Sequence, residues 1–443
     1  MSVNIKIIND LKNFITESAT QTELRELFTH SKTDFSRDRK LGFERLVLLL
    51  INFFRKSYSV EIAEFYNWLD IDDLIVSKSA FCQQRMKIKD LFFACLNEVL
   101  VQSFYEHYRQ DIKRWNGMRV IAVDGSIINL IHYDEVINHF GTQSNKSEKK
   151  FPMGQALAAY DILNGIAIRT ELYPVKISEQ RMAQQWVQYY ESDMLLIYDR
   201  GYPGFISFYL HQNKEQPQPF IMRCPLRFTY EIRDFVSSDN NDTIVAFRAN
   251  KYSSDELYKH GFVVPFGSTI NVRLIKVILD DGTIEVLATN LFNKKDYPQE
   301  IFKELYFMRW GIETSFSAIK NQLQLEAFSG QRVITIMQDF YITFFLSNLQ
   351  AIIAKPCEKR IDLITSKRLH PYKINRNIAF GIMKNRIVDL FITHNPEKIL
   401  LNLQELFIHH LEPVRHNRKY PHCRKNNKSR SKYEALTNYK RAI

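Results

Sequence analysis

Two aspartates follow strongly apolar segments, in the stretches 118-MRVIAVDGS-126 and 194-MLLIYDRGYPG-204. Both segments end in turn residues, and this pattern predicts buried strands. Asp124 and Asp199 would then lie outside the carboxyl ends of strands, where open α/β sheets place their sites. A carboxylate there needs a metal ion, a partner or water to offset its desolvation. A turn or capping role explains either aspartate alone, but explains both together less readily.

A third acid, Glu313, lies in 305-LYFMRWGIETSFSAIK-320, which we expect to be helical. At about 100° per residue, four polar side chains fall within roughly 60° of one another: Tyr306, Arg309, Glu313 and Lys320. They border an apolar stripe of the same helix. This row is either a solvated face, with an ion pair worth a few tenths of a kcal/mol, or one wall of a cleft.

Common catalytic motifs do not occur in the sequence. It contains no P-loop, no dinucleotide-binding glycine turn, no nucleophile elbow and no H-E-x-x-H. Carboxylates without such motifs suit hard divalent cations, which take oxygen ligands. Two Mg²⁺ ions about 3.5–4 Å apart can activate a water or a 3′-hydroxyl and stabilise the leaving oxygen of a phosphodiester. The acids therefore indicate metal-dependent phosphodiester chemistry.

Chain length, cysteine spacing and hydropathy limit the classes of protein to which the chain can belong. The 443 residues suffice for two or three domains, and the five scattered cysteines form no CxxC pair. The amino terminus lacks the features of a signal peptide, and the longest apolar run, 46–54, is too short to span a bilayer. We therefore expect a soluble cytoplasmic protein without membrane partners.

The positive charge is concentrated at the carboxyl end. From Arg415 onwards the chain contains ten Lys and Arg residues and one acidic residue, so +9 of the formal charge of +11 lies there. Such a tail favours a polyanionic partner, nucleic acid first. The alternative is a solvated tail with no specific partner.

Residues 1–115 are expected to be helical. Two of the predicted helices, 59–69 and 78–96, are joined by a short link. They form either a plain bundle or a helix-turn-helix. In the second case four side chains would face DNA: Gln83, Gln84, Arg85 and Lys87.

From residue 116 the expected order is strand, hairpin, helix, strand, helix, strand, with the hairpin at Asn164-Gly165. Four β segments, beginning with 229–236, should follow. A helix should then begin near Pro298, followed by a buried helix over about 336–354. The chain from about 366 should be helical and increasingly basic.

Three stretches resemble the acidic motifs of DDE transposases: Asp124-Gly-Ser, Asp199-Arg-Gly-Tyr and Tyr306-x2-Arg309-x3-Glu313-x6-Lys320. The resemblance covers about residues 40–350 and is to the bacterial insertion-sequence branch with the Tyr-Arg-Glu-Lys signature. It implies an α/β fold with a ribonuclease-H-like mixed sheet and a β-rich insertion. A helical N-terminal domain would precede it, and a helical, basic C-terminal region would follow.

The expected domains are a helical N-terminal domain for DNA end recognition (1–115), the first part of the catalytic core (116–225), the insertion (226–297), the last part of the core (298–360) and the C-terminal region with its basic tail (361–443).

The resemblance also implies roles for single residues. Asp124, Asp199 and Glu313 would be catalytic and bind two Mg²⁺ or Mn²⁺ ions. Tyr306, Arg309 and Lys320 would contact phosphates of the transposon end. The partners would be double-stranded DNA, as inverted repeats and target, and a second copy of the chain on paired ends.

Relatives that cut through a DNA hairpin stack a flipped base on a tryptophan of the insertion. The four tryptophans here, at 68, 115, 186 and 310, lie outside it. Either the hairpin step is absent, or another aromatic side chain takes that role: Phe247, Tyr252, Phe262 or Phe266.

The sequence thus predicts a cut-and-paste transposase that hydrolyses the phosphodiester at its element's ends and joins the freed 3′-OH to target DNA. One alternative is a metal-dependent nuclease without strand transfer. Another is a catalytically inactive DNA-binding relative, against which the retention of all three acids counts.

Overall fold

The computed structural model describes residues 2–52, 56–70, 76–144 and 150–414. The chain forms two compact units. The helical unit comprises Met1–Asp111, Asn129–Met153 and Ala318–Ile443, and the sheet unit comprises Ile112–Ile128 and Gly154–Ser317.

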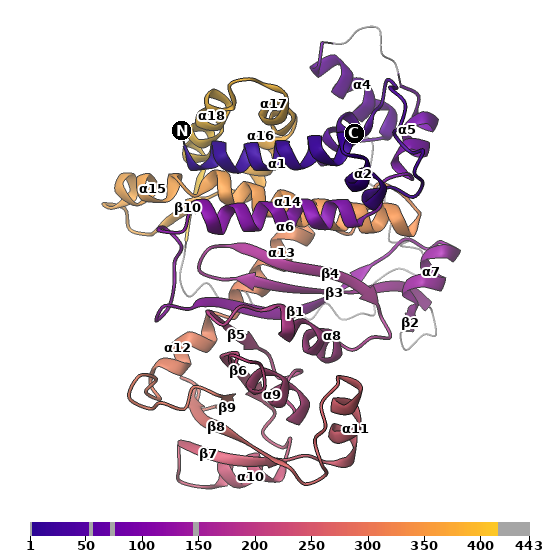
Figure 1. Cartoon of the computed structure of the whole chain (residues 1–443). Coiled ribbons are helices and arrows are strands. Elements are labelled where there is room, and N and C mark those ends of the chain that lie inside the picture. The colour runs from indigo at the N-terminus through magenta and orange to yellow at the C-terminus, as the bar shows by residue number, and fades with distance from the viewer. Residues whose placement is uncertain (1, 53–55, 71–75, 145–149, 415–443) are drawn as a thin grey trace, which may run out of the picture. The chain divides into compact units, whose positions relative to one another are not determined.

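A mixed sheet dominates the sheet unit (Figure 1). Its strands are β1 (Arg119–Asn129), β3 (Lys150–Asp161), β4 (Ile166–Pro174), β5 (Met194–Tyr198), β6 (Phe220–Cys224), β7 (Asp242–Arg248), β8 (Thr269–Ile278) and β9 (Ile284–Thr289). They lie in the order β4-β3-β1-β5-β6-β9-β8-β7, and the short β2 (Thr142–Ser144) pairs with the start of β3. β1, β5 and β6 are parallel, whereas β4 and β9 pair antiparallel with their neighbours. The predicted ribonuclease-H-like mixed sheet is confirmed.

Alternating apolar residues place helices on both faces of this sheet. In β5, Leu195 and Ile197 belong to the core that contains α12 (Ile301–Phe307). Leu196 and Tyr198 belong to the opposite core. That core also contains side chains of α8 (Glu179–Trp186), α9 (Phe205–Gln212) and α10 (Tyr230–Ser237). This period of two is the reason both faces of β5 are buried.

The predicted hairpin is present, and Gly165 takes the left-handed conformation (φ +73°) that its turn requires. The predicted strand at 229–236 is wrong, because this segment forms α10. The Thr229 hydroxyl caps the helix, and Ile232 and Phe235 are buried three residues apart on one side. With α11 (Lys251–Lys259), the segment 226–297 contains two helices besides its three strands.

The helical unit contains a long buried helix, as predicted. Its helices are α1 (Val3–Thr20), α2 (Thr22–Phe28), α3 (Phe43–Ile51), α4 (Tyr58–Trp68), α5 (Lys78–Arg85), α6 (Leu91–His107), α7 (Asp134–Phe140), α14 (Val333–Ala354), α15 (Cys357–Thr365), α16 (Arg376–Met383), α17 (Arg386–Ile392) and α18 (Pro396–His409). Strands β10 (Tyr372–Ile374) and β11 (Leu411–Pro413) form a small separate sheet. α6 and α14 pack side by side (Figure 1), and most side chains of α14 are buried.

One predicted helix of this unit is divided. The segment 78–96 forms α5 and α6, because Ile88 between them pairs with Thr29 in an isolated β-bridge.

Within the described ranges, no helix is long and apolar enough to cross a membrane.

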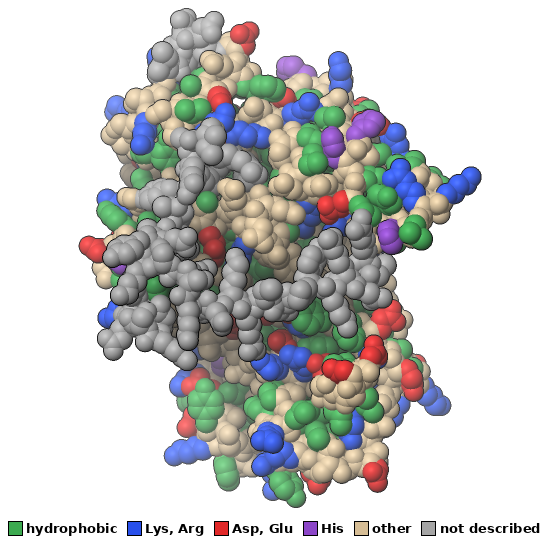
Figure 2. All heavy atoms as spheres, turned by 180° about the vertical axis from the view of Figure 1, so that it is seen from behind, with side chains coloured by type: hydrophobic (Ala, Val, Ile, Leu, Met, Phe, Trp, Pro, Cys, Tyr) green, Lys and Arg blue, Asp and Glu red, His purple; other side chains and the backbone are tan. Residues whose placement is uncertain are grey.

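The surface agrees with the uneven charge of the sequence. On the face in Figure 2, the visible Lys and Arg side chains are interspersed with acidic and apolar ones. Only +2 of the formal charge falls before residue 415. The predicted basic tail, from Arg415 onwards, lies outside the described residues.

Candidate active site

Strand register brings the first charged groups together. Val123, Tyr198 and Met222 are partners across the parallel strands β1, β5 and β6. The next residues along the chain are Asp124 in β1, Asp199 directly after β5 and Arg223 in β6, which therefore follow one another across the sheet at strand spacings of about 4.8 Å. β1 extends beyond Asp124 to Asn129, so this aspartate lies within a strand and not at its end.

The Asp124 carboxylate is largely buried, with 18% of its side chain exposed. Its Oδ1 accepts a hydrogen bond from the Gly125 backbone, and its Oδ2 lies 3.6 Å from Nη1 of Arg309. Burial raises the pKa of Asp124 to about 7, and the nearby Glu179 and Glu313 add to this, although Arg309 and the Gly125 N–H oppose it. The carboxyl therefore depends on a nearby cation to stay ionised at neutral pH.

Asp199 is held ionised by its neighbours. Its Oδ1 lies 2.7 Å from Nη2 of Arg223 and accepts a hydrogen bond of 3.2 Å from the Tyr306 hydroxyl. Burial alone would raise the pKa of Asp199, but the Arg200 N–H and the guanidinium groups of Arg223 and Arg309 outweigh it and lower that pKa.

The predicted single helix at 305–320 is two helices. α12 ends at Phe307, and α13 (Trp310–Asn321) begins after a tight turn. In this turn the Arg309 N–H donates to the carbonyl of Tyr306, three residues back, at 3.0 Å. Three-residue bonds depart from the 3.6-residue period, so the regular helical period is interrupted between Tyr306 and Arg309.

Arg309 is the centre of the cluster and only 2% exposed. Its Nη2 lies 2.8 Å from Oε1 of Glu313, whose side chain is 39% exposed. Its guanidinium carbon lies 5.7 Å from the ring centre of Tyr306 and 5.1 Å from that of Trp310. Nε and Nη1 are buried without a hydrogen-bond acceptor among the described residues. The predicted Arg309–Glu313 pair forms, but on a buried arginine and not on a solvated face.

Five of the six residues expected at the site therefore lie together in the sheet unit: Asp124, Asp199, Tyr306, Arg309 and Glu313. Lys320 belongs to the helical unit. There its Nζ lies 3.8 Å from Glu326, which also accepts hydrogen bonds from Asn129. Burial lowers the pKa of Lys320, against the effect of Glu326.

Two further charged residues at the site were not predicted. Arg223 pairs with Asp199 and, at 2.6 Å, with Glu285. A cation inside the apolar stretch 220-FIMRC-224 was a visible signal. Glu179, the first residue of α8, looks in the sequence like an ordinary first-turn acid, so nothing there marks it as a site residue.

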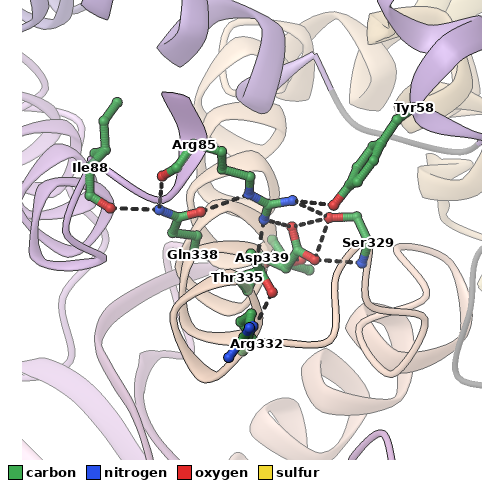
Figure 3. A network of polar contacts seen from close by, with 9 residues as sticks. Tyr58, Arg85, Ile88, Ser329, Arg332, Thr335, Gln338 and Asp339 are labelled. Atoms are coloured by element: carbon green, nitrogen blue, oxygen red, sulfur yellow. Dashed lines mark hydrogen bonds and ion pairs between the residues drawn. The ribbon is translucent and has the colours of Figure 1, made fainter. Parts of the chain in front are cut away.

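The alternative in which Arg85 faces DNA is contradicted, because its side chain is buried. Figure 3 shows its guanidinium in a network inside the helical unit, and its side chain is only 1% exposed. It donates to Gln338 at 2.7 Å, to Asp339 at 2.8 Å and to Ser329 at 2.7 Å. Of the other three side chains expected to face DNA, Gln84 is buried, Lys87 is half-buried and Gln83 is exposed.

The aromatic side chains of the insertion differ in exposure. Phe247 is buried and Phe262 partly buried. Tyr252 and Phe266 are 67% and 77% exposed. Only the last two are open enough to stack on a base.

Each of the three acids lies within ion-pair distance of an arginine. Within the described ranges, no three Asp, Glu, His or Cys side chains are spaced to hold a metal ion. Arg309 separates Asp124 from Glu313, and Arg223 covers Asp199. The donors nevertheless fit a hard divalent cation, because all three acids offer carboxylate oxygens.

Comparison with known proteins places this cluster in a family. The family model described as the transposase DDE domain matches residues 115–349, more than half of the chain, and this range contains all three acids. The chain belongs to the DDE transposase family. As a DDE transposase it is a member of a family that generally uses divalent metal ions.

Among solved structures, the DDE transposase is similar to the piggyBac transposase in its cryo-EM synaptic complex with hairpin DNA. The TM-score is 0.44 at 8% sequence identity, over 91% of this chain and 84% of that one. The comparison with curated proteins found no match.

Proposed function

We propose that this transposase hydrolyses the phosphodiester at the ends of its element and joins the freed 3′-OH to target DNA by cut-and-paste transposition. The observation that supports this is the convergence of Asp124, Asp199 and Glu313 around Arg309 within the matched domain. Paired carboxylates that need a cation are suited to phosphodiester chemistry and not to nucleophilic catalysis by a serine or cysteine.

The proposed metal ligands are Asp124, Asp199 and Glu313, which would hold two Mg²⁺ or Mn²⁺ ions. When bound, the ions would activate the attacking water or 3′-OH and stabilise the leaving oxygen. Arg223 and Arg309 form ion pairs with the same carboxylates.

The proposed phosphate contacts are Tyr306, Arg309 and Lys320. Arg309 carries the strongest argument, because its Nε and Nη1 are buried without an acceptor. Leaving such donors unsatisfied is costly. A phosphate oxygen of the transposon end would satisfy one of these donors through a charge-assisted hydrogen bond.

We propose double-stranded DNA as the partner, both as terminal inverted repeats and as target, with two copies of the chain acting on paired ends. Segment 1–115 would recognise the ends, and the tail within 361–443 would hold the polyanion. The core would comprise 116–225 and 298–360, with 226–297 as the insertion. A bacterial cytoplasmic enzyme, associated with the nucleoid when bound to DNA, fits these roles.

A strand-transfer assay tests the proposal against its alternatives. The protein is mixed with Mg²⁺, a precut transposon end carrying a free 3′-OH, and a supercoiled target plasmid. We expect the end to be joined to the plasmid, and Glu313→Gln to abolish joining. Cleavage of uncut ends without joining would instead indicate a nuclease. Binding without either reaction would indicate an inactive relative.

A further inference from the structure

Glu179 contacts three separate segments of the sheet unit. Its Oε1 accepts a hydrogen bond of 2.6 Å from Nε2 of Gln155 on β3. Its Oε2 accepts one of 3.2 Å from the hydroxyl of Tyr202. The side chain also packs directly against Gly125. The carboxylate is thus held by two hydrogen bonds and one steric contact.

The contact with Gly125 explains the need for glycine there. A Cβ atom at this position would lie 2.4 Å from Cδ of Glu179 and 2.6 Å from its Oε1. Real Cβ atoms do not approach other atoms so closely, so a larger residue would displace the carboxylate. The requirement at this position is space and not an unusual backbone conformation, since Gly125 is not in the left-handed region.

The three contacts link both aspartate motifs. Gly125 follows Asp124 directly, and Tyr202 closes the Asp199-Arg-Gly-Tyr turn. Tyr202 is only 2% exposed, which holds its hydroxyl in place. A displacement of Glu179 would therefore be transmitted to both segments.

Glu179 also differs from the other acids in the charged groups that surround it. Asp124, Asp199 and Glu313 each lie near an arginine. Among the residues that the structure describes, Glu179 forms no ion pair with Lys, Arg or His and is held by neutral donors alone. A partly buried negative charge of this kind is unfavourable alone and favourable once a divalent cation binds nearby.

We propose that Glu179 is a fourth acidic group of the active site, a positioning residue that ties the Asp124 and Asp199 segments together and strengthens divalent cation binding by its charge. This inference rests on the proposed function, since it concerns the same metal-binding carboxylates.

The variant Glu179→Gln isolates the charge. Its amide oxygen can accept from Tyr202, and Gln155 can turn its own amide to accept from the new NH₂ group. Shape and hydrogen bonds are then kept while the charge is lost. We expect Mn²⁺ binding by the full chain, followed by EPR titration, to weaken about tenfold because a full charge is removed beside the cation. The matched control is Glu215→Gln, an exposed acid of the same unit, which should bind Mn²⁺ like the parent.

A second pair of variants tests the position of the Glu179 carboxylate separately from its charge. Gly125→Ala should lower the melting temperature, because the new methyl group collides with Glu179. The double variant Gly125→Ala/Glu179→Ala removes the collision and should recover melting temperature relative to Gly125→Ala, while its Mn²⁺ affinity stays low. A Gly125→Ala protein as stable as the parent would show that Glu179 moves aside at no cost, which contradicts a positioning role for its contact with Gly125.

The outcomes distinguish the inference about Glu179 from the proposed function on which it rests. If Glu179→Gln binds Mn²⁺ as tightly as the parent while Asp199→Asn does not, the inference about Glu179 is overturned and the proposed function stands. A lowered melting temperature with unchanged Mn²⁺ affinity would likewise leave Glu179 a purely structural role. If the parent itself has no Mn²⁺ site sensitive to Asp199→Asn, the proposed metal site fails and the inference fails with it.

Discussion

Arg309 is nearly inaccessible to water and contacts two of the three acids. Complete removal of its side chain would therefore disturb the fold as well as any DNA contact, contrary to what an exposed helical row would predict. Arg309→Lys is the more specific test of a phosphate contact, since it keeps the charge but loses the planar guanidinium group that suits phosphate. We expect the folded protein to persist while end binding or cleavage falls at least about tenfold.

Thermal melting and a gel shift on the same preparation check this expectation. Lys303→Ala is the matched control, because Lys303 lies on the neighbouring helix α12 and its ion pair with Asp280 is exposed. A loss of stability in Arg309→Lys without any DNA defect would contradict a phosphate role.

Glu313→Gln tests the acid that lies on a helix, α13. The substitution keeps an oxygen acceptor for Arg309, so folding should be nearly unchanged, and DNA binding should persist or tighten as repulsion from phosphate falls. Cleavage in Mg²⁺ should drop by several orders of magnitude, because a neutral amide is a poor ligand for a hard cation. End cleavage and a gel shift measured side by side check this. Cleavage near the parent rate would rule out the three-carboxylate site.

Asp124 gives the site a pH dependence. Burial raises its pKa from 3.8 to about 7, so between these values the folded protein binds more protons than the unfolded chain. The free energy of unfolding therefore falls as pH rises through this window. In EDTA, Asp124→Asn should be more stable than the parent, on the order of 1–3 kcal/mol at pH 8. Denaturant unfolding from pH 4 to pH 8 should show this advantage growing with pH. An advantage independent of pH would contradict the assignment.

At the scale of elements, the Arg85 network joins α5 to α14 within the helical unit (Figure 3). Arg85→Met would leave Asp339 buried without its cation, and such a loss costs about 3–5 kcal/mol. Lys78→Met, on an exposed position of the same helix, should change stability by less than about 0.5 kcal/mol. Chemical denaturation of both variants measures the difference. Equal stability of the two would show that the network contributes nothing.

The elements themselves were largely predictable from local patterns. Apolar runs of β-branched residues located β1 and β5, and Asn164-Gly165 located the hairpin. The pattern failed at 229–236, where alternating polar and apolar residues suit a strand although the segment is α10. There the threonine cap and the spacing of Ile232 and Phe235 decide the structure. Such short segments fit both the helical period of 3.6 residues and the strand period of two, so tertiary packing determines whether a helix or a strand forms.

At the scale of the whole chain, the tail carries most of the net charge. Deleting residues 415–443 should weaken binding to any duplex and flatten the dependence of log K on log salt, since each lost phosphate contact changes that slope by about 0.9. Fluorescence anisotropy with one duplex at several salt concentrations measures the slope. An unchanged slope would mean that the tail does not contact phosphate.

The acids of the site and the Arg309–Glu313 pair could be recognised from local sequence, but the partners of Asp124 and Asp199 could not. Arg223 meets Asp199 only because β5 and β6 are parallel and in a particular register. Glu179 approaches Asp124 only because α8 begins against Gly125. These contacts depend on how distant segments pair and pack, which no local periodicity encodes.

The arginine pairs at Asp199 and Asp124 have a consequence for the order in which the enzyme is assembled. A cation must compete with Arg223 and Arg309 for the same carboxylates, whereas DNA phosphate offers these arginines another partner. DNA should therefore raise the affinity for the cation, and by thermodynamic reciprocity the cation should raise the affinity for DNA by the same factor. On the proposed function, a protein not engaged with an end would bind the metal weakly, and unrelated phosphodiesters would be spared from cleavage.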